Sequence, residues 1–102
     1  MSEIRTFLGQ TAQFSALRHL AEKYGDLPGA YVTCPNFTGE ISLLLDSLTD
    51  FEAWREALGV PASGVALHSN NPQRSLQILL PVGDVVVRIW AVIEPIPAKE
   101  SA

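Results

Sequence analysis

Residues 85–93, VVVRIWAVI, constrain the fold of this 102-residue chain more than any other stretch. Their β-branched and aromatic side chains are typical of a strand, and Gly83-Asp84 just before them fits a tight turn. Side chains alternate between the two faces of a strand, so Arg88 and Trp90 share one face with aliphatic neighbours. A strand that is apolar toward both faces needs cover on both, from its own chain or from a partner.

Four shorter apolar runs are also predicted to be strands, and they cover residues 29–35, 40–46, 65–69 and 75–82. The third run ends within HSNNPQR, residues 68–74, which leads directly into the fourth run. Asparagine tolerates a left-handed backbone and Pro72 fixes its own φ, so this stretch is expected to be a hairpin turn rather than a functional loop. Only His68 and Arg74, at its two ends, remain candidates for function.

Residues 11–24, TAQFSALRHLAEKY, have the spacing of an amphipathic helix. Thr11 is the expected cap, and Gly25 followed by Pro28 ends the helix. The side chains expected to face the core are Phe14, Leu17, Leu20, Ala21 and Tyr24.

The second helix, within residues 48–59, carries a capping-box pattern, in which Thr49 caps the amide of Glu52 and Glu52 reaches back to Thr49. Leu48 and Ala53 have the spacing of a hydrophobic staple. Gly59 supplies the left-handed residue that stops the helix. The expected buried stripe is Phe51, Trp54, Ala57 and Leu58.

Residues 14–45 and 51–80 echo each other, since both run through helix, proline-containing loop, strand, turn and strand. The match is short, so ancestry and chance both stay open. It predicts two αββ units side by side, with the last strand added. The predicted fold is therefore one α+β domain over residues 1–102 in the order αββαβββ. Its five-stranded sheet is mainly antiparallel, and both helices cover one face.

The two ends of the chain are less defined. Residues 1–10 are expected to form a lead-in, or an edge strand over residues 4–8. Residues 95–102, PIPAKESA, are predicted to be a disordered tail, because two prolines break any strand pairing and the ending is polar.

Composition and charge bear on the partners and the compartment. The formal net charge is −4 and the seven lysines and arginines are scattered, which disfavours nucleic-acid binding by phosphate neutralisation. The first ten residues lack a signal-peptide pattern, and no apolar run approaches the roughly 18–20 residues that span a bilayer. The single cysteine, Cys34, suits a reducing compartment. A cytoplasmic protein without membrane contact is expected.

Catalytic chemistry is weakly indicated. Cys34 and His68 fall at matching places in the echo, so they could form a thiolate–base pair oriented by Asn36 or Asn70. Because cysteine is among the most buried residue types, an inert Cys34 is favoured and a Cys34-dependent enzyme is a minor alternative. His19, Cys34 and His68 lack the spacing of zinc ligands. No cofactor, metal or small-molecule substrate is predicted.

The second face of the sheet is the expected place of function. Alternation predicts that it carries Tyr31, Thr33, Ser42, Leu44, Ala66, His68, Gln77, Leu79, Val86, Arg88, Trp90 and Val92. A solvated face would be mostly polar, whereas this one mixes aromatic, aliphatic and basic side chains, as protein contact sites do. The alternative is that the N-terminal segment, with Ile4, Phe7 and Leu8, covers this face.

The segments LPGAYV (27–32), FEAWREALGV (51–60) and VVVRIWAVI (85–93) resemble short uncharacterised α+β proteins of actinobacteria and their phages. The resemblance is one of layout and covers most of the chain. It implies the fold and a bacterial, cytoplasmic setting, but no activity and no site residue.

The function expected from the sequence is that of a small, non-enzymatic module that binds a protein partner or associates as a homodimer through this second face. The expected contact residues are Tyr31, Leu44, His68, Leu79, Arg88 and Trp90. Trp90 is the expected anchor, Arg88 offers a planar charged fork, and His68 would tune affinity across neutral pH. A nucleic-acid-associated accessory or regulatory protein is the alternative, with Tyr31 and Trp90 as stacking platforms and Arg74 and Arg88 on phosphates.

Overall fold

The computed structural model describes residues 6–35, 39–70 and 73–93. Two helices and five strands follow one another in the predicted order αββαβββ, which confirms the fold class. The elements are α1 (Thr11–Lys23), β1 (Tyr31–Thr33), β2 (Glu40–Leu44), α2 (Leu48–Leu58), β3 (Ala66–Asn70), β4 (Gln73–Val82) and β5 (Val85–Ile93). Two short 3₁₀ turns, η2 (Leu8–Gln10) and η3 (Ala62–Gly64), precede α1 and β3.

The five strands form one sheet in the order β1-β2-β5-β4-β3. Three of its pairings are antiparallel, and the pairing of β2 with β5 is parallel. Val87 of β5 pairs with Ile41 of β2 on one side and with Leu80 of β4 on the other. The expected side-by-side placement of the two αββ units is therefore wrong, because β5 lies between their hairpins.

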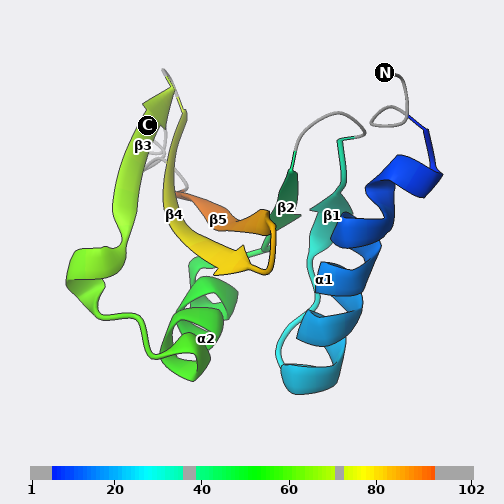
Figure 1. Cartoon of the computed structure of the whole chain (residues 1–102). Helices are drawn as coiled ribbons and strands as arrows, with labels where there is room; N and C mark the ends of the chain where they lie inside the picture. Colours follow the sequence, from blue (N-terminus) through cyan, green and yellow to red (C-terminus); the bar gives the residue numbers. More distant parts are fainter. Residues whose placement is uncertain (1–5, 36–38, 71–72, 94–102) are drawn as a thin grey trace, which may run out of the picture.

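The core lies between the sheet and the two helices, which both pack on the same side of it (Figure 1). β5 contributes Val85, Val87, Ile89 and Ala91, all buried, to this core. α2 contributes Phe51 and Trp54, and the Trp54 indole donates a hydrogen bond to the Pro28 carbonyl at 2.9 Å. The core residues are Ala16, Leu20, Ile41, Leu43, Leu45, Phe51, Trp54, Ile78, Val85, Val87, Ile89 and Ala91.

The buried face of α1 differs from the expected stripe. Leu20 is buried as predicted, but Phe14 and Ala21 are exposed, and Gln13 and Ala16 are buried in their place. The Gln13 amide donates to the carbonyls of Pro35 at 2.7 Å and Glu40 at 2.8 Å. This side chain faces inward because it supplies donors to the backbone between β1 and β2, which an apolar pattern does not detect.

The expected start of α1 is also wrong. Thr11 is the first residue of the helix rather than its cap, and its hydroxyl donates to the Leu8 carbonyl of η2. Phe7, just before η2, lies against Phe14 of α1 with ring centroids 5.0 Å apart. Of the possible edge strand over residues 4–8, residues 6 and 7 are not in a strand and Leu8 begins η2, while residues 1–5 and the expected tail at 95–102 lie outside the described residues.

The cap of α2 lies two residues earlier than the capping-box pattern predicts. The Ser47 hydroxyl accepts a hydrogen bond from the Asp50 amide at 3.1 Å, so Ser47 rather than Thr49 is the cap. Glu52 instead accepts from the Arg55 guanidinium at 2.7 Å, and this hydrogen bond lowers the pKa of the Glu52 carboxyl. Gly59, with φ of 72°, ends the helix in the left-handed conformation as predicted.

Both predicted hairpin turns are confirmed by the strand register. Asn70 pairs with Gln73, so residues 68–74 are the end of the β3–β4 hairpin, with residues 71–72 outside the described residues. Val82 pairs with Val85, and Gly83 between them has φ of 61°, as the first central residue of a type II′ turn requires. Neither described helix has the length and apolarity needed to cross a bilayer.

The cap of α2 gives a direct test of the structure. We expect Ser47→Ala to lower the free energy of unfolding by about 1 kcal/mol, because the Asp50 amide loses its acceptor. In the matched control, Thr49→Ala, the change is expected to stay within about 0.5 kcal/mol. Urea unfolding of both variants measures this, and a larger loss for Thr49→Ala than for Ser47→Ala would contradict the assigned cap.

Candidate functional site

The candidate site is the face of the sheet opposite the two helices, which we call the open face. In the strand register its side chains come from all five strands. They are Tyr31, Thr33, Glu40, Ser42, Leu44, Ala66, His68, Gln73, Ser75, Gln77, Leu79, Pro81, Val86, Arg88, Trp90 and Val92. Every residue predicted for this face lies on it. Leu67 points to the opposite side of the sheet but is 60% exposed, because β3 is an edge strand.

The six predicted contact residues are all on the open face. Five of them form two groups, and the sixth lies apart. Tyr31, Leu44 and Trp90 are directly opposite one another across β1, β2 and β5. Leu79 is opposite Arg88 across β4 and β5. His68 lies on the edge strand β3, where it pairs with Ser75 rather than with another predicted residue.

Trp90 and Arg88 are held by two polar side chains that sequence reasoning did not single out. The Trp90 indole donates to the Ser42 hydroxyl at 2.8 Å, and Arg88 Nε donates to Gln77 Oε1 at 2.7 Å. The Arg88 guanidinium carbon lies 4.3 Å from the centre of the Trp90 ring, which is a cation–π contact. We call Ser42, Gln77, Arg88 and Trp90 the Trp90 cluster. These contacts fix the position of the guanidinium.

Sequence alternation placed Ser42 and Gln77 on the correct face but did not show that they bind Trp90 and Arg88. The register sets Ser42 opposite Arg88 and Gln77 opposite Trp90, so both hydrogen bonds run diagonally between strands. They therefore depend on how the strands pair, which the sequence pattern does not give. Ser75 was missed as a member of this face. It is 5% exposed, which is unusual for a serine on the open side of a sheet.

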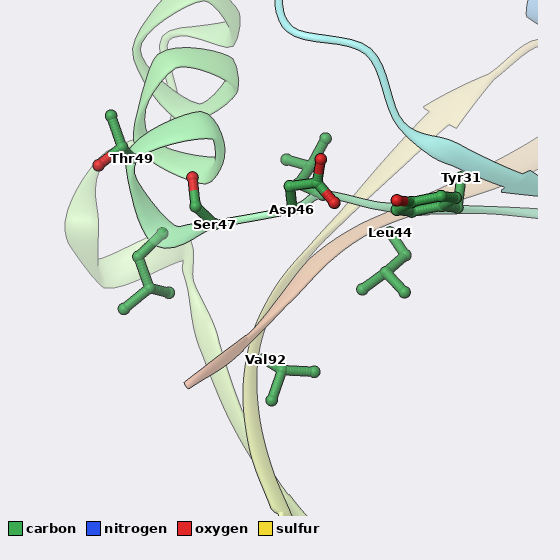
Figure 2. A pocket seen from close by; sticks show the side chains of 8 residues that line it. Tyr31, Leu44, Asp46, Ser47, Thr49 and Val92 are labelled. Atoms are coloured by element: carbon green, nitrogen blue, oxygen red, sulfur yellow. The ribbon is translucent and has the colours of Figure 1, made fainter. Parts of the chain in front are cut away.

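Two hollows adjoin the open face. The larger has a volume of about 490 Å³ and lies where β1, β2 and β5 meet the start of α2. Figure 2 shows the side chains of Leu44 and Val92 extending to the same side of it, with Tyr31 and Asp46 close by. The smaller, of about 260 Å³, lies beside the Trp90 cluster and includes Ser75.

The expected proximity of Cys34 and His68 is wrong. Cys34 follows β1 at one edge of the sheet, whereas His68 is in β3 at the other, because β5 separates the two hairpins. Four strand spacings put the two edges roughly 19 Å apart, too far for a thiolate–base pair. Within the described ranges, no three His, Cys, Asp or Glu side chains are grouped to hold a metal ion.

The residues proposed for nucleic-acid stacking are not equivalent. Tyr31 is exposed at the edge strand β1, but Trp90 is half-buried and the Arg88 guanidinium lies over its ring. A base needs a free aromatic face to stack on. The arrangement therefore leaves one open stacking platform, Tyr31, rather than two.

Comparison with known proteins adds no name to this geometry: no protein-family model, curated protein or solved structure matches the chain. The resemblance to actinobacterial and phage proteins stays a prediction, and any assignment of function depends on the residues themselves.

The reactivity of the Cys34 thiol tests the hypothesis that the protein is a Cys34-dependent enzyme. Burial raises the pKa of the Cys34 thiol, so at a given pH the folded protein holds less of the reactive thiolate than an exposed cysteine does. We expect iodoacetamide to alkylate the folded protein more slowly than the chain unfolded in urea, with a rate that rises at higher pH. Since Cys34 is the one cysteine, mass spectrometry of the adduct reports it alone. If the folded protein is alkylated faster than the unfolded chain near neutral pH, the expectation is contradicted and a catalytic role for Cys34 is supported.

Proposed function

We propose that this protein is a small, non-enzymatic binding module that associates with a second copy of itself through the open face. The observation that carries the proposal is the apolar surface on that face. Tyr31 is 63%, Leu79 56% and Val86 41% exposed. The solvated face of an antiparallel sheet is ordinarily polar, and a cluster of exposed apolar side chains marks an interaction surface.

The Trp90 cluster supports this role because it is already ordered. Trp90 and Arg88 hold each other in place and have hydrogen-bond partners in the same chain. Side chains that are immobile before association lose less entropy when a partner binds. Tyr31 and Leu79 flank the cluster and supply the exposed apolar area.

The distribution of charge favours a second copy as the partner. Acidic side chains lie on the β2 side, with Glu40 in the strand and Asp46 just beyond its end, and both are exposed. On the other side, His68 of β3 and Arg74 of β4 line the smaller hollow together with Arg88 of β5, at the end of the sheet where Asp46 also lies. A twofold axis parallel to β5 places the β2 side of one copy over the β4 side of the other. Asp46 of each copy then lies over the arginine-lined hollow of the other, and this contact occurs twice in one symmetric interface.

The proposal includes a cytoplasmic setting. The lone cysteine suits a reducing compartment. Its side chain is half-buried, as in an ordinary structural cysteine. A bacterial or phage origin follows from the resemblance alone and is part of the same proposal.

Self-association is tested by sedimentation equilibrium of the wild type and Leu79→Gln. Leu79 is exposed, so its replacement by glutamine spares the core and removes apolar area from the open face. We expect a dimer in the wild type and a dissociation constant raised about tenfold or more in the variant.

Leu67→Gln is the matched control, because Leu67 is exposed to a similar degree but points to the opposite side of the sheet. The same substitution there is expected to leave the dissociation constant unchanged. A wild type that stays monomeric at the highest attainable concentration would overturn self-association.

A further inference from the structure

The smaller hollow, of about 260 Å³, has a lining unlike the rest of the open face. It is lined by His68, Gln73, Arg74, Ser75, Arg88 and Trp90, from β3, β4 and β5. Two arginines are thus among the lining residues, and no Asp or Glu is. In a protein of net charge −4, such a local excess of positive charge favours an anionic ligand.

Arg88 is the most constrained cation of this pocket. Its Nε donates to Gln77 and its plane lies against the Trp90 ring, so its position is fixed before any ligand arrives. Arg18 and Arg55 both pair with glutamates, at 3.0 and 2.7 Å. Arg88, although half-buried, has no carboxylate partner in the described part of the chain. Its two terminal nitrogens remain available as donors to an oxyanion.

Ser75 is a second, independent indication of a ligand. The residue is only 5% exposed and lines the pocket, yet within residues 6–35, 39–70 and 73–93 its hydroxyl has no hydrogen-bond partner. Buried polar groups are nearly always paired, and the exceptions call for an explanation. A bound oxygen atom in the pocket would accept the hydroxyl proton and remove the unpaired group.

The backbone around the pocket bears on whether it suits a phosphate or a carboxylate. Phosphate sites draw on backbone N–H groups at helix starts or in nests. Here the walls are three paired strands, whose ladders already use the N–H groups between them. The donors are therefore side chains. A guanidinium presents two of them in a plane that matches two oxygens of a carboxylate or of a phosphate, and without free backbone N–H groups for further oxygens the pocket suits the carboxylate.

We propose that this pocket binds a carboxylate group. One or both of its oxygens accept from the terminal nitrogens of Arg88, and one accepts from the Ser75 hydroxyl. Arg74 is a second arginine among the lining residues, and Trp90 offers apolar contact to the carbon chain behind the carboxylate. The inference depends on this pocket and holds without self-association, since the carboxylate can belong to a free organic acid or to a side chain of the second copy.

Acetate is the probe, because it carries the carboxylate with one methyl group. We expect a saturable shift of the Trp90 indole and Arg88 Nε–H signals in ¹⁵N NMR spectra, with a dissociation constant on the order of millimolar. The titration is run at constant ionic strength set with chloride, since screening changes with salt. It uses protein dilute enough to be monomeric by sedimentation, so a failed dimer does not affect the result.

Three variants locate the site. Arg88→Gln is expected to weaken acetate binding about tenfold or more, and Ser75→Ala about threefold, since each removes donors to the carboxylate. Ser75→Ala also covers the case in which Arg88→Gln unfolds. Arg18→Gln is the control, because it makes the same charge change at an exposed residue of α1 and should bind acetate as the wild type does.

Two further measurements identify the source of the carboxylate and compare acetate with inorganic phosphate. If acetate also weakens the dimer in sedimentation experiments, the natural carboxylate comes from the second copy, and if the dimer is unaffected it comes from a free organic acid. Both results support the pocket. The proposal is overturned if acetate causes no saturable shift, if Arg88→Gln and Ser75→Ala bind acetate as tightly as the wild type, or if inorganic phosphate binds more tightly than acetate.

Discussion

The pairing of β5 with β2 on one side and β4 on the other holds the two halves of this protein together. Each half is a helix followed by a hairpin, and a hairpin alone is at best marginally stable in water. β5 supplies a shared neighbour to both hairpins, and its residues Val85, Val87 and Ile89 bring both into contact with the same core. Because Ile41 and Val87 pair although they lie far apart in the sequence, the core forms only when distant segments meet.

The same strand organises the candidate site on its other face. Arg88 and Trp90 alternate with the core residues of β5, so the packing that fixes the core also fixes the backbone beneath the Trp90 cluster. Ser42 arrives from β2 and Gln77 from β4, one on each side. A rigid element thus positions the polar contacts of the open face, and a central strand is well suited to this role.

The order of the elements and the faces of the strands could be predicted from the sequence, because they depend on local signals. Alternating apolar residues, Gly83 and the Asn-Pro turn all act within a few positions. The predicted cap of α2 was wrong because serine and threonine have chemically similar side chains, and both Ser47 and Thr49 could cap the helix. Leu45 is still bonded to β5, through its N–H to the Trp90 carbonyl at 2.8 Å, so the chain turns into α2 at Ser47.

Other features depend on contacts between distant residues and could not be predicted from local patterns. Gln13 is buried because the backbone between β1 and β2 presents carbonyls to it, and Ser75 is part of the pocket because Arg88 extends along the sheet toward it. The insertion of β5 between the hairpins separated Cys34 from His68, which the internal echo had placed together.

The place of β5 in the sheet also has a consequence for synthesis on the ribosome. The central strand is the last of the five to be translated, so both hairpins emerge before the strand that joins them exists. Until then the nascent chain exposes two unpaired inner edges, on β2 and β4, which are templates for pairing with another chain. The β2–β5–β4 contact can close only late in translation, and the interval before it closes is when this chain is most exposed to misassembly.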